Sequence, residues 1–408
     1  MLYLIRKASV HYHSKPAIPA IITLGAVQIL SWGGSFYLMA VMAAPIIAET
    51  GWSQQWVYGA LSLGILVSGL LAPLSGRLIA RGYGPLILAG GGVIMASGLV
   101  VMGLSYQPGW FFAAWLLIGT GMAMSLYDAL FATLGTLYGG QARSAITGVT
   151  LISGLCTTLV WPGTAWLIAL AGWRDACFII AALLTLLVFP AYRYALPAPV
   201  TQTGSRGGPT GAASDTLQSA LSPRLFWLLC AIFTLASVIM TAISVQLITL
   251  LQSGGYSLSA ALALSAVLGP CQIGSRLLDV MFKRSHPIWT ALFSVGLVAA
   301  GLLLLALFPA MALIAMVLYG AGNGLRAIVR GTLPLAVVRP EQYAVITGRM
   351  ARPALIGQAL TPLAGGWLAA HAGADVTLWV LCGLAGINVV LVALLKQQLP
   401  AQASSVQN

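Results

Sequence analysis

The sequence predicts an all-α membrane protein with twelve transmembrane helices, arranged as two parallel six-helix repeats with both termini in the cytoplasm. Three observations predict this fold. Of the 408 residues, 59% are hydrophobic and only 6% are charged, whereas a soluble domain carries about a quarter charged residues. Twelve apolar stretches are long enough to cross a bilayer. The positive charges, finally, gather in alternate loops between these stretches.

Each stretch meets the requirement for a membrane-spanning helix, which is about 20 predominantly apolar residues. The mean hydropathy of the chain is +0.95, and several of the stretches carry almost no charge. In chain order they are 18–47, 52–75, 84–105, 109–137, 143–170, 174–196, 224–252, 258–282, 287–308, 310–337, 343–370 and 375–396. The apolar run that begins at residue 18 is too long for a signal peptide, so we interpret it as an uncleaved first span.

The loop charges give the orientation. Among Lys and Arg, the loops on one side contain Arg174 alone. The loops and tails on the other side contain Arg6, Lys7, Lys15, Arg77, Arg81, Arg143, Arg193, Arg206, Arg224, Lys283, Arg284, Arg339 and Lys396. Because positive charge marks cytoplasmic loops, this side is predicted to be cytoplasmic. The bias also accounts for the net charge of +12, and without a basic patch interleaved with aromatic residues no nucleic acid partner is expected.

The longest polar stretch divides the chain into two sets of six predicted helices. It runs from Ala198 to Ser219 and is rich in Gly, Ser and Thr, a composition typical of flexible linkers. We therefore expect an N-terminal six-helix bundle at 1–196, a cytoplasmic linker at 197–222 and a C-terminal six-helix bundle at 223–408.

Short matches at a nearly constant offset relate the two halves. The matching pairs are Ile146–Gly148 with Ile346–Gly348, Pro162 with Pro362, Gly119 with Gly320, and Gly121 with Gly322. An even number of helices in each half preserves orientation, so the repeat is parallel. Transporters whose halves rock around a site at the membrane midplane have this arrangement.

Other function classes find little support. The five cysteines are scattered through apolar segments without a C-x-x-C pair, so no metal site and no disulfide framework is indicated. An enzyme would need a nucleophile with a base, or metal ligands, within the spans, and the sequence presents no such cluster. We expect a non-enzymatic protein without cofactors, monomeric and embedded in a lipid bilayer. Short loops and abundant Ala and Gly suggest a bacterial inner membrane.

The whole chain resembles the major facilitator superfamily. The loop after the second predicted helix reads GRLIARGYGP, from Gly76 to Pro85. Gly76, Arg81 and Gly84 resemble the family signature of Gly, three residues, Asp-Arg, one residue and Gly. Ala80 replaces the Asp, which in the family joins a charge network at the cytoplasmic gate. The resemblance implies a twelve-helix secondary transporter that works by alternating access.

Finer features resemble the monocarboxylate porter and oxalate/formate antiporter branch. They are GWR at Gly172–Arg174, Arg143 followed by Gly148, and GSRLL at Gly274–Leu278. In that branch an arginine of helix eight commonly meets the substrate carboxylate, and Arg276 matches it. The Asp often found four residues earlier is here Gln272, and the branch's lysine in helix one is absent. The alternative is a proton-driven exporter of drugs or metabolites, although Gly148–Gly163 lacks the Gly-Pro pair of those proteins.

The predicted substrate site is rich in arginine. Arg276 lies in helix eight, and Arg326 and Arg330 share one face of helix ten. An Arg facing hydrocarbon costs at least about 2.5 kcal/mol, so these side chains should face water, an anion or a carboxylate. A guanidinium donates two parallel hydrogen bonds to a carboxylate, which favours a small organic anion. Arg349 and Arg352 near the start of helix eleven, like Arg330, are also interpretable as gate or snorkelling residues.

Asp128 is an acidic residue within a predicted span. Aligning the Gly-x-Gly pairs sets Ser125 against Arg326 and Ala129 against Arg330, so Asp128 is expected at the depth of those arginines on the opposite half. In one interpretation it carries a coupling proton, since desolvation raises a carboxyl pKa and an adjacent arginine lowers it. In the other it is a fixed partner that closes the cytoplasmic gate. The sequence leaves both open.

Helix one offers uncharged candidates for substrate binding: Gln28, Trp32, Ser35 and Tyr37. With Arg276, Arg326, Gln272 and Arg330 they form the predicted substrate-binding set. The predicted proton-coupling or gate set is Asp128, Arg77, Arg81, Arg143, Arg349 and Arg352. The expected activity is secondary active transport of a monocarboxylate-like anion, with a proton as the plausible coupling ion.

Overall fold

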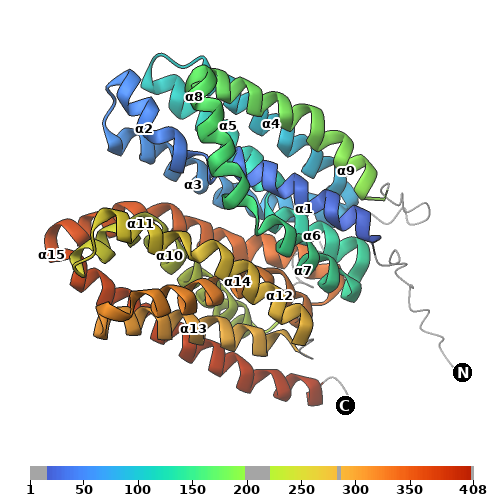
Figure 1. The fold of residues 1–408 in the computed structure, drawn as a ribbon. Helices are drawn as coiled ribbons and strands as arrows, with labels where there is room; N and C mark the ends of the chain where they lie inside the picture. The colour runs from blue at the N-terminus through green and yellow to red at the C-terminus, as the bar shows by residue number, and fades with distance from the viewer. Residues whose placement is uncertain (1–15, 198–220, 283–285, 406–408) are drawn as a thin grey trace, which may run out of the picture.

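The computed structural model describes residues 16–197, 221–282 and 286–405. The regular structure in these ranges is helical, without strands, and the helices form two bundles lying side by side (Figure 1). The N-terminal bundle contains α1 (Ile18–Gly33), α2 (Met39–Thr50), α3 (Gln54–Leu78), η1 (Ile79–Tyr83), α4 (Gly84–Gly103), α5 (Pro108–Ser125), α6 (Tyr127–Tyr138), η2 (Gly139–Gln141), α7 (Ala142–Ser153), α8 (Cys156–Leu183), η3 (Leu184–Val188) and α9 (Phe189–Ala195).

The C-terminal bundle contains α10 (Pro223–Ser253), α11 (Leu258–Ala266), α12 (Leu268–Phe282), α13 (Pro287–Leu307), η5 (Pro309–Met311), α14 (Ala312–Val337) and α15 (Pro340–Ser405). The start of α1 and the end of α15 lie at the same end of the molecule (Figure 1). The predicted linker at 197–222 falls almost entirely outside the described residues, so its course stays a prediction.

These helices make twelve crossings of a bilayer. Seven continuous helical stretches are long and apolar enough to cross a membrane, but three of them have 50, 88 and 60 residues. A 50-residue helix is about 75 Å long, more than twice the hydrocarbon thickness of about 30 Å. The three stretches fold back at turns and supply two, three and two crossings. Four single stretches and the α1–α2 pair supply the remaining five.

Two of the turns repeat one backbone conformation. Gly172 divides α8 with φ 83° and ψ 167°, and Gly373 divides α15 with φ 86° and ψ 169°. A side chain other than hydrogen is disfavoured at this positive φ. The two glycines are 201 positions apart, the same offset as the matches between helices four and ten, so the repeat extends to the connection between the last two helices of each half.

The paired glycines of helices four and ten have equivalent packing roles. A Cβ atom at Gly119 in α5 would collide with Gly64 of α3, and one at Gly320 in α14 with Cys271 of α12. Likewise, Gly121 faces α4, and Gly322 faces the corresponding helix α13. The fourth helix of each half thus contacts the second and third helices through its glycines, which confirms the parallel repeat in three dimensions.

Four predicted continuous spans are divided in the structure. The first is interrupted between Gly33 and Met39, the fourth at Leu126, the fifth between Ser153 and Cys156, and the eighth at Val267. Leu126 has an extended backbone, with φ −79° and ψ −175°, although no Gly or Pro marks the position. Such breaks inside a bilayer free backbone groups from the helix, and these groups must find partners within the protein.

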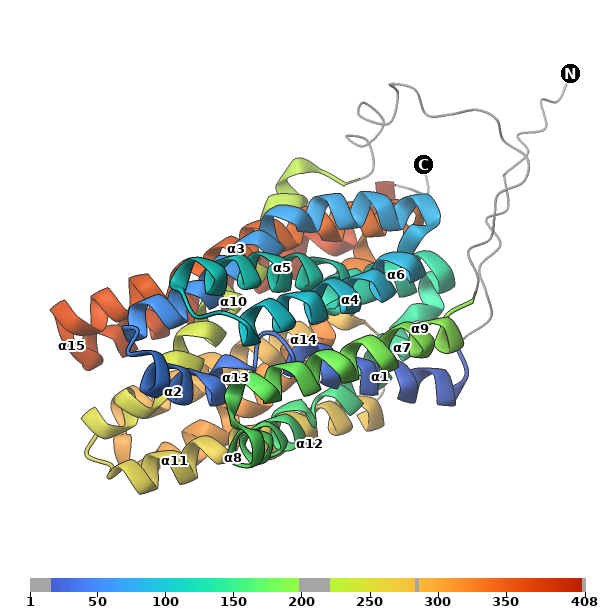
Figure 2. The same cartoon turned by 90° about the horizontal axis from the view of Figure 1, so that it is seen from above.

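The two bundles meet near the end that the charge bias predicts to be cytoplasmic. Gly76, close to the end of α3, packs against Ala344 and Gly348 near the start of α15. At the same end, Gly135 of α6 leaves room for the ring of Tyr343. Figure 2 shows α3 running alongside α15, and the two helices are in contact. This end is closed by direct contact between the bundles.

Candidate functional site

A cavity lies between the two bundles. Its volume is about 40 Å³, room for about three water molecules if each needs 10–15 Å³. Side chains from α1, the α1–α2 connection, α6, α7 and α8 line it on one side and side chains from α10, α12 and α14 on the other. Six predicted substrate-binding residues are in its wall: Trp32, Tyr37, Gln272, Arg276, Arg326 and Arg330.

Arg276 spans the interface between the bundles. It is 5% exposed, Nε donates to the Gly324 carbonyl oxygen in α14 at 3.0 Å, and Nη1 donates to the Thr150 carbonyl oxygen in α7 at 2.6 Å. Gly154, at the break between α7 and α8, leaves room for this guanidinium. Arg276 therefore already uses part of its donor capacity to join α12 to both α14 and the opposite bundle.

Asp128 and Arg330 form a two-point ion pair across the bundles. Nε of Arg330 donates to Oδ1 of Asp128 at 2.7 Å, and Nη2 donates to Oδ2 at 2.6 Å. The side chains are 14% exposed for Arg330 and 23% for Asp128. Because the chain breaks at Leu126, Asp128 falls in the first turn of a new helix, α6, where the helix dipole favours a negative charge. The break thus places the carboxylate within reach of its partner.

Arg326 has a different environment from its two neighbours. Nε donates to Oδ1 of Asn323 at 2.8 Å, and no carboxylate among the described residues forms an ion pair with this guanidinium. The nearby charged groups that act on it are Arg276 and Arg330, both positive. A buried charge is costly unless it is paired. Neither Arg276 nor Arg326 forms an ion pair in the described chain, but Arg276 donates to two backbone carbonyl oxygens, whereas the one acceptor of Arg326 is the Asn323 side chain.

Gln28 and Ser35 do not line the cavity, in contrast to the other candidates of helix one. Gln28 is fully buried; Nε2 donates to the Ser125 carbonyl oxygen at 2.7 Å and to the Tyr192 hydroxyl at 3.2 Å, and Oε1 accepts from Nε1 of Trp32 at 3.2 Å. It therefore supplies a partner for a carbonyl at the α5–α6 break and orients Trp32. Ser35, also fully buried, donates to the Ser31 carbonyl oxygen.

Aromatic side chains form the wall of the cavity on the N-terminal side. The ring of Trp32 lies 5.7 Å from that of Tyr37 and 5.0 Å from that of Tyr127, measured between centroids. The Tyr127 hydroxyl forms a hydrogen bond with that of Ser153. Tyr127, Ser153 and Asn323 were missed from the sequence. Adjacency to Asp128 could have pointed to Tyr127, and the GAGNGLR run could have pointed to Asn323.

The remaining gate candidates lie outside the cavity. Arg77, Arg81, Arg349 and Arg352 are exposed, and Arg143 is half-buried. Nε of Arg77 donates to the Pro73 carbonyl oxygen at 3.3 Å. The geometry brings none of these five to the Asp128–Arg330 pair, and their assignment to a gate stays a prediction.

Comparison with known proteins identifies relatives by family and by fold. The family model of the Major Facilitator Superfamily matches residues 24–351, whereas no curated protein matches the sequence. Among solved structures, the transporter FucP in an outward conformation superposes with a TM-score of 0.74 at 12% identity, covering 93% of this chain and 98% of that one.

Two further solved structures have the same fold. The human organic anion transporter MFSD10 has a TM-score of 0.65 at 15% identity, covering 92% of this chain and 98% of that one. A variant of the E. coli fucose:proton symporter FucP has a TM-score of 0.67 at 13% identity, covering 93% and 98%. At these identities the likeness concerns the fold. The resemblance to the monocarboxylate porter branch stays a prediction.

Proposed function

We propose that this chain carries a small, monocarboxylate-like organic anion through the cavity between its bundles by alternating access. The chain belongs to the major facilitator superfamily and is therefore a multi-pass membrane transporter. The solved structures with this fold include an organic anion transporter and a fucose:proton symporter. The fold therefore accommodates either substrate class, and the choice must rest on the residues of this cavity.

The observation that carries the proposal is the environment of Arg326. Its guanidinium lines the cavity, two positive neighbours surround it, and it has no carboxylate partner in the described chain. The three arginines of the cavity are opposed by Asp128, which pairs with Arg330. A carboxylate ligand would supply the missing charge and accept the two parallel hydrogen bonds that a guanidinium offers. The small cavity volume suits a short substrate in this conformation.

The Asp128–Arg330 pair supports a role in closing the predicted cytoplasmic end. It joins α6 of one bundle to α14 of the other, on the side where the glycine contacts also hold the bundles together. A proton that neutralised Asp128 would remove the charge that holds Arg330, and the bundles could then separate at this end. The gate and proton-coupling interpretations of Asp128 are thus compatible: the charged carboxylate holds the gate closed through Arg330, and the protonated carboxyl group releases it.

The experiment is uptake of radiolabelled short monocarboxylates into proteoliposomes. Arg326→Ala should reduce uptake by at least about tenfold, because a charge-assisted hydrogen bond contributes ~1.5–3 kcal/mol. Arg193→Ala is the matched control, since Arg193 is exposed and does not line the cavity. Normal uptake by Arg326→Ala, or no uptake of any carboxylate by the wild type, would overturn the anion proposal.

The alternative activity, export of drugs or metabolites, is favoured by the aromatic wall of Trp32, Tyr37 and Tyr127. Aromatic faces attract organic cations, but the neighbouring arginines repel them. Growth of an expressing strain in cationic dyes distinguishes the two activities. Dye resistance that survives Arg326→Ala would favour the exporter, whereas competition between carboxylates and the labelled substrate would favour the anion transporter.

A further inference from the structure

A second cavity, which we call the inner chamber, lies inside the C-terminal bundle. Side chains of α10, α13, α14 and α15 line it, and its volume is about 30 Å³. Three residues, Met240, Asn323 and Arg326, belong to the walls of both the inner chamber and the cavity between the bundles. The inner chamber thus adjoins the proposed substrate site, separated from it by these side chains.

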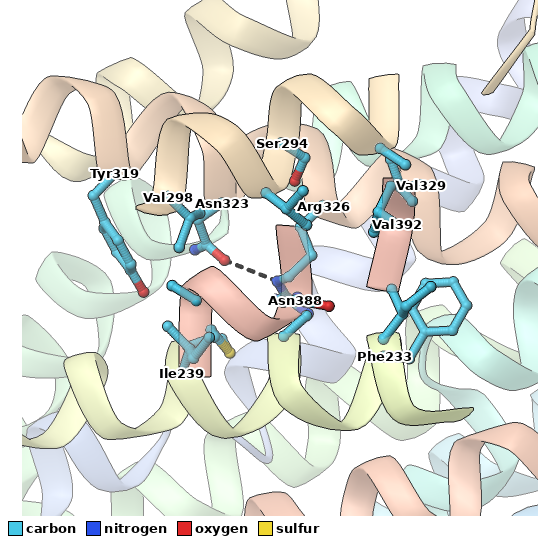
Figure 3. A pocket seen from close by; sticks show the side chains of 16 residues that line it. Phe233, Ile239, Ser294, Val298, Tyr319, Asn323, Arg326, Val329, Asn388 and Val392 are labelled. Atoms are coloured by element: carbon cyan, nitrogen blue, oxygen red, sulfur yellow. Dashed lines mark hydrogen bonds between the residues drawn. The ribbon is translucent and has the colours of Figure 1, made fainter. Parts of the chain in front are cut away.

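The polar groups of the inner chamber surround the end of the Arg326 side chain. Figure 3 shows Arg326 and Asn388 extending into it, with Asn323 bonded to Arg326 and Tyr319 at the far side. The rest of the wall is mostly aliphatic, including Ile239 and Val298. Such a wall offers few oxygen atoms that could bind a cation. A few aligned donors in apolar surroundings, by contrast, bind an anion strongly, because electrostatic interactions are strengthened at low dielectric.

Asn388 provides a second, independent indication of a ligand. Its side chain is 3% exposed, and its Oδ1 atom is buried without a hydrogen-bond partner. No hydrogen bond joins its amide group to another described residue. The Oδ1 atom is an acceptor and would take a hydrogen bond from a donor such as water, whereas the Nδ2 group of the same amide is the part that faces an anion. The amide nitrogen is a donor of the kind that an anion accepts from.

We propose that the inner chamber binds a small monovalent inorganic anion of the size of chloride, held by the guanidinium of Arg326 and the amide of Asn388. The chamber has room for about two water molecules, so a monatomic anion fits and an organic acid with a side chain does not. The bound anion is the missing counter-charge of Arg326 when the cavity between the bundles is empty. The substrate then competes for the same guanidinium; this last step rests on the proposed function, whereas anion binding itself does not.

The test is thermal unfolding of the full-length protein in lipid nanodiscs, with chloride or bromide replacing isethionate, an anion without a carboxylate, at constant ionic strength. The wild type should be stabilised in a saturable manner by both halides. Asn388→Leu should raise the half-saturating concentration at least about tenfold, because hydrogen bonds to a charged group contribute ~1.5–3 kcal/mol. Ala236→Leu, which fills the chamber from α10, is the second variant in case the first does not fold.

Two controls locate the effect. Thr157→Val alters a residue that lines only the cavity between the bundles, and it should leave the halide response unchanged. Ala300→Leu adds the same volume as Ala236→Leu on the exposed face of α13, and it should also keep the response. A wild type without a saturable halide response would mean that the chamber holds water alone, and the proposal would fail.

A halide response lost in Thr157→Val but kept in Asn388→Leu would place the anion in the other cavity and would also overturn the inner-chamber site. Neither result bears on carboxylate uptake, which is measured separately. Conversely, a wild type that binds halide through Asn388 but transports no carboxylate would overturn the proposed function and leave the anion site standing.

Discussion

The two bundles have one backbone plan and different interiors. At the level of the Gly-x-Gly pair, the N-terminal bundle has Ser125, whose carbonyl oxygen is held by Gln28, with Tyr192 completing the network. The C-terminal bundle has Arg326 at the matching position, and beside it lies the inner chamber. Counting 20 residues on from Gly172 and Gly373 sets Tyr192 against Ala393. The comparison teaches that at this level the N-terminal half places a hydrogen-bonded network where the C-terminal half places a charged side chain and a cavity.

The largest expected effect comes from the pair that joins the halves. Arg330→Asp leaves two facing carboxylates, and uptake should fall below detection, because breaking a buried ion pair costs about 3–5 kcal/mol. The partial exposure of both side chains puts the expected loss of stability toward the lower figure. Proteoliposome uptake and thermal unfolding measure the two effects.

The reciprocal exchange, Asp128→Arg with Arg330→Asp, controls for the loss of either residue alone. It recreates an ion pair with the charges reversed. Cysteine cross-linking between the two bundles at the predicted cytoplasmic end, which Arg330→Asp should reduce, should therefore return to the wild-type level even if uptake does not. Failure of the exchange to restore that closure would mean that the pair is not what holds the bundles together there.

Fold and site differ in how far the sequence determines them. The spans were predictable because bilayer thickness fixes their length and composition. The Asp128–Arg330 pairing was within reach because the Gly-x-Gly offset set Asp128 at the depth of Arg330. The break at Leu126 could not be predicted, since its cause is tertiary: Gln28, about 100 residues away, satisfies the freed carbonyl group. The same contact turns Gln28 away from the substrate site.

The inner chamber is a second feature that the sequence did not reveal. Asn388 is a single polar residue in an apolar helix and has no spacing signature. A cavity depends on the volumes of side chains from four helices, and no local pattern records their sum. Residues that act through long-range contacts are therefore the ones that sequence reasoning missed.

An intermediate effect tests whether the backbone plan is really shared. Gly172→Ala and Gly373→Ala each put a side chain at a positive φ, which costs about 1–3 kcal/mol. Because the two sites have nearly the same φ and ψ and neither has another atom near the added Cβ, the two variants should lower the melting temperature by similar amounts. Gly51→Ala, at φ 69°, provides a third site for comparison. A large effect at one turn glycine and none at the other would contradict the shared conformation.

The smallest effect concerns a contact present in the N-terminal bundle at the turn after Gly172. Arg174 donates through Nε to Glu49 at 2.8 Å and through Nη1 to the Gly103 and Ser105 carbonyl oxygens at 2.8 and 2.7 Å. At the corresponding turn of the C-terminal bundle, Gly373 is followed by Ala374 and an exposed Asp375. The pH dependence of the Glu49 contact therefore tests the N-terminal bundle without a counterpart in the C-terminal bundle.

The hydrogen bond from Arg174 holds the pKa of Glu49 below its ordinary value of 4.5. A carboxyl group with a lowered pKa in the folded state stabilises the protein above its unfolded pKa, and this stabilisation is lost as the pH falls through the folded pKa. The melting temperature should therefore be insensitive to Glu49→Gln below the folded pKa and slightly lower in the variant at neutral pH. The free energy of unfolding of the two proteins at neutral pH should differ by less than about 1 kcal/mol, because the Glu49 side chain is 49% exposed and solvent screens the pair. Asp375→Asn is the matched control in the C-terminal bundle, and an equal response there would show that the contact does not distinguish the halves.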